Sequence, residues 1–148
     1  MLSSSISYIL IFHKSLKGIS LTNSMVKREI YFPERHQKGW GYEDWIVNNE
    51  KYCGKILHFQ KGKKCSIHYH ELKDETFYLI QGKLEVLVAD SPDEYEKGNI
   101  KKFILNQGEC LHLWSRRIHQ MLALEDSKLI EISTQHFEDD SYRIVKGD

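Results

Sequence analysis

Residues 62–82 read GKKCSIHYHELKDETFYLIQG, and they hold the most informative residue spacing in the chain. His68 and His70 are separated by one residue, so in a strand they point to the same face with Cα atoms about 6.5–7 Å apart. Two imidazoles at that spacing can converge on one ion with bonds of about 2.1 Å. Glu75 follows after a turn and returns on the neighbouring strand with an anionic oxygen. The spacing therefore predicts a metal site on extended backbone.

His119 is the candidate for a fourth ligand. It lies eleven positions after Gly108, at the start of a later predicted strand, where a barrel would place it across from the other three. Three imidazoles and one carboxylate suit a divalent transition metal such as Mn, Fe, Co, Ni or Zn. They leave about two positions of an octahedral ion open for a chelating substrate. The remaining histidines are interpreted as packing or surface residues: His13, His36, His58, His112 and His136.

Short apolar runs punctuated by glycine predict an all-β chain. In Lys83–Ala89 apolar and polar residues alternate, and Gln81-Gly82 indicates a tight hairpin before it. The expected strands are Tyr42–Val47, Tyr52–Phe59, Cys65–His70, Thr76–Ile80, Lys83–Ala89, Lys102–Leu105, Glu109–Leu113, Gln120–Leu124 and Leu129–Ser133. Asp90–Gly98 is expected to be an exposed loop. This spacing favours an antiparallel sandwich or barrel; an immunoglobulin-like sandwich is the competing fold, but it would not explain the histidines.

Composition excludes several classes of function. The chain has 148 residues, 21 basic and 21 acidic residues, and a formal net charge of zero. A nucleic-acid binder needs a basic face, and electrostatic membrane binding needs a basic patch. No run approaches the roughly 20 apolar residues of a membrane span. Three scattered cysteines without a CxxC pair indicate reduced thiols, so we expect a cytoplasmic protein.

The first 28 residues differ in composition from the rest. They are rich in serine and contain no acidic residue. We interpret residues 1–28 as a flexible tail or as a start assigned too early, with Met25 as the alternative first residue; a mitochondrial presequence is a further reading. Residues 29–148 are expected to form one domain with its core at 39–133, preceded by an irregular N-terminal arm.

Together, Gly62-x5-His68-x-His70-x4-Glu75-x6-Gly82 resembles the first conserved motif of the cupin superfamily, and Gly108-x10-His119 is similar to the second in spacing. The resemblance implies a small jelly-roll-like β-barrel, often a homodimer, with a metal held by His68, His70, Glu75 and His119. The second motif departs from the usual pattern. Where that motif usually has a proline, a glycine and an asparagine, this chain has Trp114, Arg116 and Ala123.

A narrower resemblance concerns residues before the metal motif together with those around its two histidines. Three segments are similar to segments of cupin-type sugar isomerases of the mannose-6-phosphate isomerase-like group: Lys38-Gly39-Trp40-Gly41-Tyr42-Glu43, Tyr52-Cys53-Gly54-Lys55 and Ser66-Ile67-His68-Tyr69-His70. That group implies aldose–ketose isomerisation of a sugar or sugar phosphate. Gly39 stands where the group typically has proline.

Such an isomerisation needs a divalent ion, a base that moves a proton between two carbons, and cations for any phosphate. Lys55, Glu43 and Tyr69 are the candidate bases, with Lys55 alternatively a stabiliser of the enediolate. Strand alternation points Tyr69 away from the metal. Arg116 and Arg117, just before His119, are the candidate phosphate ligands.

Two other functions fit the same ligands. The first is an Fe(II)-dependent dioxygenase, because the same four ligands suit a site that binds O₂ beside a chelated substrate. The second is a sugar-binding barrel without enzymatic activity. In all three cases the partner is a small molecule, with no nucleic acid and no membrane.

Overall fold

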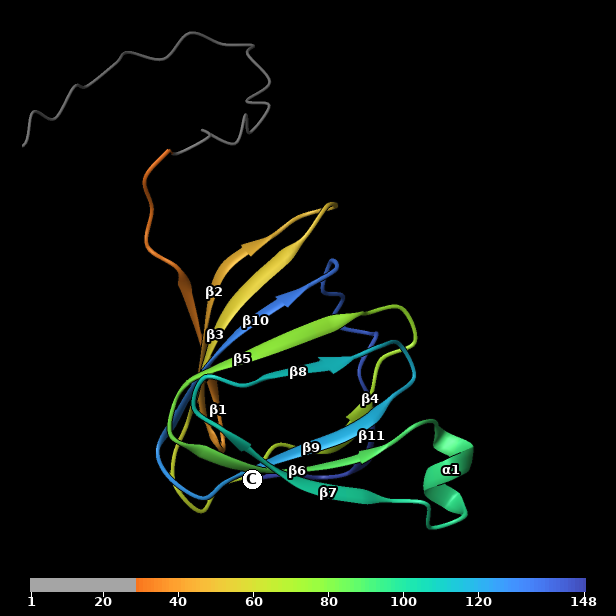
Figure 1. Ribbon diagram of the computed structural model, residues 1–148. Helices are drawn as coiled ribbons and strands as arrows, with labels where there is room; N and C mark the ends of the chain where they lie inside the picture. The colour runs from red at the N-terminus through yellow and green to blue at the C-terminus, as the bar shows by residue number, and fades with distance from the viewer. Residues whose placement is uncertain (1–28) are drawn as a thin grey trace, which may run out of the picture. The chain divides into compact units, whose positions relative to one another are not determined.

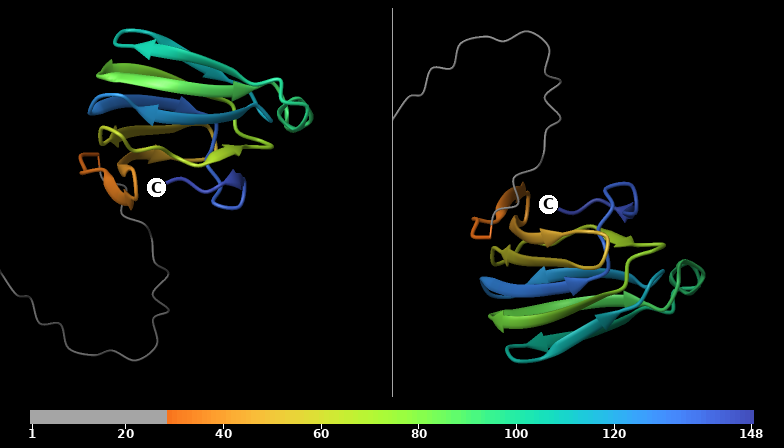
Figure 2. Two further views of the ribbon diagram at one scale, coloured as in Figure 1. Left: turned by 90° about the horizontal axis from the view of Figure 1, so that it is seen from below. Right: turned by 90° about the horizontal axis from the view of Figure 1, so that it is seen from above.

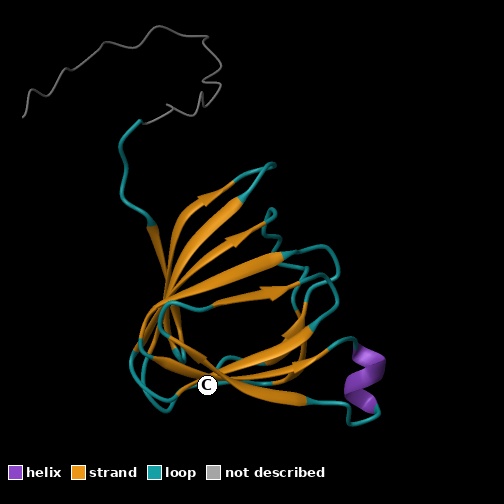
Figure 3. Cartoon of the chain, viewed as in Figure 1, coloured by secondary structure: helices purple, strands orange, loops and turns teal. Residues whose placement is uncertain are grey.

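The computed structural model describes residues 29–148, which form an almost entirely β structure (Figures 1 and 3). Its compact unit runs from Phe32 to Asp148. The expectations for residues 1–28 lie outside the described residues. Within 29–148, no helix has the length and apolar character needed to cross a bilayer.

Two antiparallel sheets face each other as layers, which are seen from the side in Figure 1 and one over the other in Figure 2. The first has the order β1 (Glu34–Lys38), β2 (Gly41–Asn48), β3 (Cys53–Phe59), β10 (Ser127–Ser133), β5 (Glu75–Gln81) and β8 (Cys110–Leu113). The second has the order β11 (Tyr142–Val145), β4 (Ile67–Tyr69), β9 (Ile118–Ala123), β6 (Lys83–Ala89) and β7 (Lys101–Asn106). Among the described strands, hydrogen bonds do not join the two sheets into a closed ring, so the predicted barrel is an open, jelly-roll-like one.

The inner faces change from apolar to polar along the strands. Alternate residues of β3 and β10 are buried, as period-two patterning predicts. One end of the space between the sheets is filled by apolar side chains, among them Leu57, Phe59, Leu79, Leu84, Val86, Met121 and Leu129. At the other end the buried positions of the first sheet carry Lys55, Glu75, Glu131 and Ser133. Burying charged side chains is costly unless they are paired, so this end is the place to look for function.

The β5–β6 hairpin is confirmed at Gln81-Gly82. Gly82 has φ 89°, and a Cβ there would lie 2.4 Å from Ser127 Oγ and 2.5 Å from Asp126 O. Only glycine fits this turn without strain. The hairpin passes the chain from the first sheet to the second, which places Glu75 and the histidine strands on facing walls.

Two strands were not predicted from the sequence. β1 lies in the segment expected to be an irregular arm and pairs with β2. β11 lies beyond the expected core and pairs with β4. The expected loop 90–98 holds the five-residue helix α1 (Pro92–Glu96), whose first turn is capped by Ser91 Oγ accepting from Glu94 N at 3.2 Å. β11 matters most here, because it forms one edge of the functional site.

Candidate metal centre

Three histidines converge between the sheets. His68 lies on β4, His70 directly follows it, and His119 lies on β9 opposite His68 in the antiparallel register. One ring nitrogen of each histidine lies within 4.8 Å of those of the other two. Strand alternation therefore brings His68 and His70 together as predicted, and the β4–β9 pairing adds His119.

Backbone carbonyls orient all three rings. Each histidine has its Nδ1 within hydrogen-bond distance of a carbonyl oxygen, and the donor must be the Nδ1–H. The acceptors for His68, His70 and His119 are Ser66 O at 3.0 Å, Asp140 O at 2.5 Å and Arg117 O at 3.1 Å. With Nδ1 protonated, each Nε2 keeps its lone pair, which is the arrangement of metal-ligating histidines.

Burial keeps these imidazoles neutral. It lowers the pKa of His70 and of His119, and it lowers the pKa of His68 to about 3. Neutral imidazole is the form that binds a metal ion. The three rings are therefore ready to bind at neutral pH without first losing a proton.

Glu75 adds an anionic oxygen to the group. Its Oε1 lies 3.2 Å from His119 Nε2 and 3.9 Å from His70 Nε2, and it is buried without a hydrogen-bond donor. Its Oε2 pairs with Lys73 Nζ at 2.8 Å. Burial alone would raise the pKa of Glu75, but Lys73 outweighs it and lowers the pKa to about 2. A buried carboxylate oxygen without a donor, facing ring nitrogens, fits a bound cation. The donor set suits a divalent transition metal.

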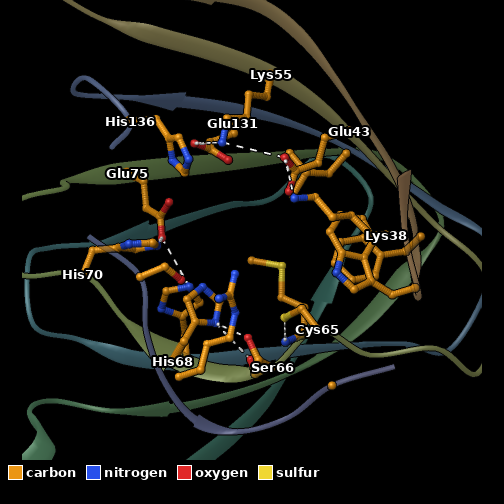
Figure 4. A pocket seen from close by; sticks show the side chains of 18 of the residues that line it. Lys38, Glu43, Lys55, Cys65, Ser66, His68, His70, Glu75, Glu131 and His136 are labelled. Atoms are coloured by element: carbon orange, nitrogen blue, oxygen red, sulfur yellow. Dashed lines mark hydrogen bonds and ion pairs between the residues drawn. The ribbon is translucent and has the colours of Figure 1, made fainter. Parts of the chain in front are cut away.

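The histidines open into a cavity of about 520 Å³ between the two sheets (Figure 4). Its opposite wall carries a chain of charged side chains from the first sheet and from Lys73, which lies in the loop before β5. Lys73 Nζ bridges Glu75 and Glu131 Oε1, and Lys55 Nζ lies 4.0 Å from the same Glu131 oxygen. Lys55 Nζ is also 3.8 Å from Glu43 Oε2. Acidic and basic groups thus alternate from the metal ligands across the cavity.

These pairs set the charge states of the wall. Burial alone would raise the pKa of Glu131, but the ammonium groups of Lys73 and Lys55 lower it. Burial alone would lower the pKa of Lys73, and its two carboxylate partners raise it instead. The wall therefore presents ionised carboxylates and ammonium groups to whatever fills the cavity.

Both predicted catalytic residues, Glu43 and Lys55, line the cavity. Trp45 holds them in place: its Nε1 donates to Glu43 Oε2 at 2.7 Å, and Lys55 Nζ lies 4.3 Å from its ring centroid. Tyr69 points to the other side of β4 and stacks on Tyr142 at 5.1 Å. Strand alternation predicted this direction.

The predicted phosphate ligands lie elsewhere. Arg116 and Arg117 do not line the cavity. Arg116 Nη1 pairs with Glu71 at 3.2 Å. Arg117 pairs with Asp90 at 3.3 Å and lies 3.9 Å over the Trp114 ring. Their position before His119 in the sequence suggested the mouth of the barrel, but both side chains pair with acidic residues that do not line the cavity. The structure gives this role no support.

Three further residues of the cavity were missed. The alternation of the predicted strand could have identified Glu131, because it occupies an inward-facing position between Leu129 and Ser133. No sequence pattern identifies Lys73, since it lies in a loop. His136, interpreted as a packing or surface residue, lines the cavity and has a buried Nδ1 without a partner.

No protein-family profile and no curated protein matches the chain by sequence. Solved structures do match. KdgF from Halomonas sp. matches at 23% identity with a TM-score of 0.55, covering 66% of this chain and 81% of that one. Oxalate decarboxylase from Bacillus subtilis, in a structure at pH 4.6, matches at 19% identity with a TM-score of 0.65, covering 76% and 30%. The capsular polysaccharide assembling protein CapF from Staphylococcus aureus matches at 16% identity with a TM-score of 0.66, covering 78% and 35%.

These neighbours establish the fold. They are cupin-fold proteins, and this chain has the same cupin β-barrel. The chain spans about a third of the length of the oxalate decarboxylase and CapF chains, so it corresponds to one part of each. A shared fold at this level of identity does not transfer an activity. Function must be argued from the site.

Proposed function

We propose that this cupin-fold chain is a metal-dependent isomerase that interconverts the aldose and ketose forms of a sugar or sugar phosphate, as mannose-6-phosphate isomerase-like cupins do. One observation carries the proposal. A three-histidine centre on one wall of the cavity faces buried carboxylates and ammonium groups on the other. This reaction needs a chelating centre and a proton-moving group on opposite sides of one substrate.

His68, His70, His119 and Glu75 would hold the metal. When bound there, a divalent ion would supply Lewis-acid polarisation of the substrate carbonyl. The chain's own contribution to this centre is the fixed orientation of the three rings and the anionic Glu75 oxygen. The site thus suits a ligand with two adjacent oxygens.

Glu43 is the general base of the proposed reaction. Its carboxylate takes the proton from the carbon that carries the hydroxyl next to the carbonyl, which gives an enediolate, and it returns the proton to the former carbonyl carbon, while the hydroxyl proton passes to the former carbonyl oxygen. No oxidant is needed, because one carbon is oxidised as its neighbour is reduced. Trp45 fixes Glu43 through the 2.7 Å hydrogen bond.

Lys55 stabilises the negative charge that develops on the enediolate oxygens. Its ammonium lies between Glu43 and Glu131, at 3.8 and 4.0 Å, and only 3% of its side chain is exposed. A preoriented charge in a site with little water stabilises a transition state more than one in bulk water. Lys55 is therefore assigned as an electrostatic partner rather than a base.

The ligand chemistry named for one structural neighbour is compatible with this assignment. CapF is described with an inhibitor, 3-isopropenyl-tropolone. A tropolone carries a carbonyl and a hydroxyl on adjacent carbons, the same pair of oxygens that an aldose or ketose presents.

The proposal also includes a homodimer and a cytoplasmic location. The three cysteines are free thiols, as expected for a reducing compartment.

The test is turnover of pentoses, hexoses and their phosphates by protein loaded with Mn²⁺, Co²⁺, Ni²⁺ or Zn²⁺, under argon and under air. We expect aldose–ketose interconversion without O₂. Glu43→Gln should retain the metal and lose turnover, whereas His112→Ala, at an exposed histidine paired with Asp74, should change neither. Activity that needs Fe(II) and consumes O₂ would assign a dioxygenase. A ligand that raises the melting temperature but is recovered unchanged would assign a binding protein.

A further inference from the structure

We propose that Arg143 and Lys146 form an oxyanion-binding subsite beside the metal centre, so that the substrate carries a carboxylate or a phosphate group. The inference rests on the proposed function for the sugar framework of the ligand. The anionic group itself is argued from the cavity alone. It replaces Arg116 and Arg117, which the structure places outside the cavity.

The register of the second sheet puts Arg143 next to the metal ligands. Arg143 on β11 is directly opposite His68 on β4, and His68 is directly opposite His119 on β9. Residues directly opposite each other in antiparallel strands share a face, with Cβ atoms about 4.5–5.5 Å apart. The three side chains thus form one row, and all three line the cavity. The β11–β4 register shifts between Arg143 and Val145, the kind of irregularity that redirects side chains beside active sites.

Arg143 and Lys146 differ from the other cations of the cavity in having no partner. Lys38 pairs with Glu43 at 3.6 Å, and Lys55 and Lys73 belong to the charged wall. Within residues 29–148, the side chains of Arg143 and Lys146 make neither an ion pair nor a hydrogen bond. An unpaired guanidinium in a concave site is suited to an oxyanion from outside.

The charge of the cavity favours an anionic ligand. Five basic side chains line it: Lys38, Lys55, Lys73, Arg143 and Lys146. Five acidic side chains balance them: Glu43, Glu75, Glu131, Glu138 and Asp148. A divalent ion at the centre would therefore leave a surplus of two positive charges for the ligand to neutralise.

The segment that carries these cations is firmly held. Gly147 packs against the backbone just before His68, where a Cβ would lie 2.5 Å from Cys65 C and 2.6 Å from Ser66 N. Asp148 Oδ2 accepts from Lys64 N at 2.8 Å. Arg143 and Lys146 are thus held on the cavity wall on either side of the register shift. Such support is what a specific subsite requires.

The chemistry of the cations defines the ligand class. A guanidinium matches carboxylate and phosphate oxygens through two parallel N–H donors, and Lys146 adds a point charge. A neutral sugar offers no such group. We therefore expect a sugar phosphate or a sugar acid, with its reacting carbons at the histidines and its anionic end at β11.

The test is equilibrium binding, by calorimetry at low ionic strength, of glucose, glucose 6-phosphate and glucuronate to the Zn²⁺-loaded full-length protein. These probes share one framework and differ at one carbon, so the two anionic arms separate phosphate from carboxylate recognition. We expect at least one anionic probe to bind about tenfold or more tightly than glucose. Arg143→Gln should abolish that preference with unchanged zinc content, and Lys146→Gln should reduce it.

Arg116→Gln is the matched control, because it removes an exposed arginine outside the cavity. It should keep the full preference for the anionic probe. The inference is overturned if neither anionic probe binds more tightly than glucose, or if folded Arg143→Gln keeps the wild-type preference. Because binding is measured without turnover, these outcomes are independent of whether the protein isomerises any sugar.

Discussion

His68 and His119 are directly opposite each other in the β4–β9 ladder, with ring centroids 4.2 Å apart. The two residues come from distant parts of the chain, so the metal centre forms only when the second sheet is paired in this register. A shift of one residue would turn one ring to the other face. The register that builds the sheet therefore also builds the site, and the same ladder extends through β11 to Arg143.

Lys73 should contribute strongly to stability. Its ammonium bridges the buried carboxylates of Glu75 and Glu131, so Lys73→Met leaves two buried like charges with only the Lys55 ammonium, 4.0 Å from Glu131, near them. We expect the free energy of unfolding of the metal-free protein to fall by about 3–5 kcal/mol, measured in urea at pH 7. Lys97→Met, at an exposed lysine on the protein surface, should leave it close to the wild-type value. Equal effects of the two substitutions would contradict the role assigned to Lys73.

Arg116 should tolerate glycine better than most residues. It has φ 68°, the left-handed region, at the position where the second cupin motif has glycine. Non-glycine residues are disfavoured in this region by about 1 kcal/mol or more, a cost partly offset by the greater backbone entropy of an unfolded glycine. We expect Arg116→Gly to raise the free energy of unfolding by up to about 1 kcal/mol. Arg117→Gly, which removes the contact with Trp114, should lower it, and a loss from Arg116→Gly would show that the turn does not need a left-handed residue.

Asp140 should support the metal centre from outside it. Its carboxylate accepts the backbone N–H groups of Glu71 at 2.8 Å, Leu72 at 3.2 Å and Lys73 at 3.1 Å, while its carbonyl orients His70. Asp140→Ala should lower the free energy of unfolding by about 3 kcal/mol. It should also weaken metal binding roughly 10–100-fold, measured by competition with a chelator.

The exposed neighbour Asp139 provides the control for this substitution. Asp139→Ala should leave both the stability and the metal affinity close to those of the wild type. Wild-type metal affinity in folded Asp140→Ala would mean that the loop between β4 and β5 is positioned by other contacts.

His136 should make the protein less stable in mild acid. Burial, together with the ammonium groups of Lys55 and Lys73, lowers its pKa to about 4. Between that value and the unfolded pKa of about 6.5 the unfolded chain binds a proton that the folded chain does not, so stability falls as the pH falls. His136→Gln should flatten this dependence by up to about 1.4 kcal/mol per pH unit, measured by urea unfolding at several pH values from 4 to 7. Parallel curves for the wild type and the variant would contradict the assignment.

Most of the fold followed from local sequence patterns. Strands with alternating apolar residues, such as Lys83–Ala89, were predicted because one of their faces is buried, and this strand has the expected bounds. β1 and β11 were missed for the opposite reason. They are edge strands with mostly exposed side chains, so they have no periodic apolar pattern and owe their structure to pairing with β2 and β4.

The site was predictable where its residues are close in sequence. His68, His70 and Glu75 came from a local spacing, and the structure gathers them with His119. The charged wall depends on contacts between distant segments, so Lys73 gave no signal. Arg116 and Arg117 do not line the cavity although they are close to His119 in sequence, because the direction of a side chain in a turn depends on backbone conformation, not on distance along the chain.

Metal content is the sharpest test of the four-ligand centre. We expect about one transition-metal ion per chain in protein purified from metal-supplemented growth, measured by elemental analysis. His70→Ala should lose that metal while keeping the β-sheet circular dichroism of the wild type, and His112→Ala should keep the metal. Less than about a tenth of an ion per chain in the wild type, or full occupancy in His70→Ala, would contradict the assignment of His68, His70, His119 and Glu75 as a metal centre.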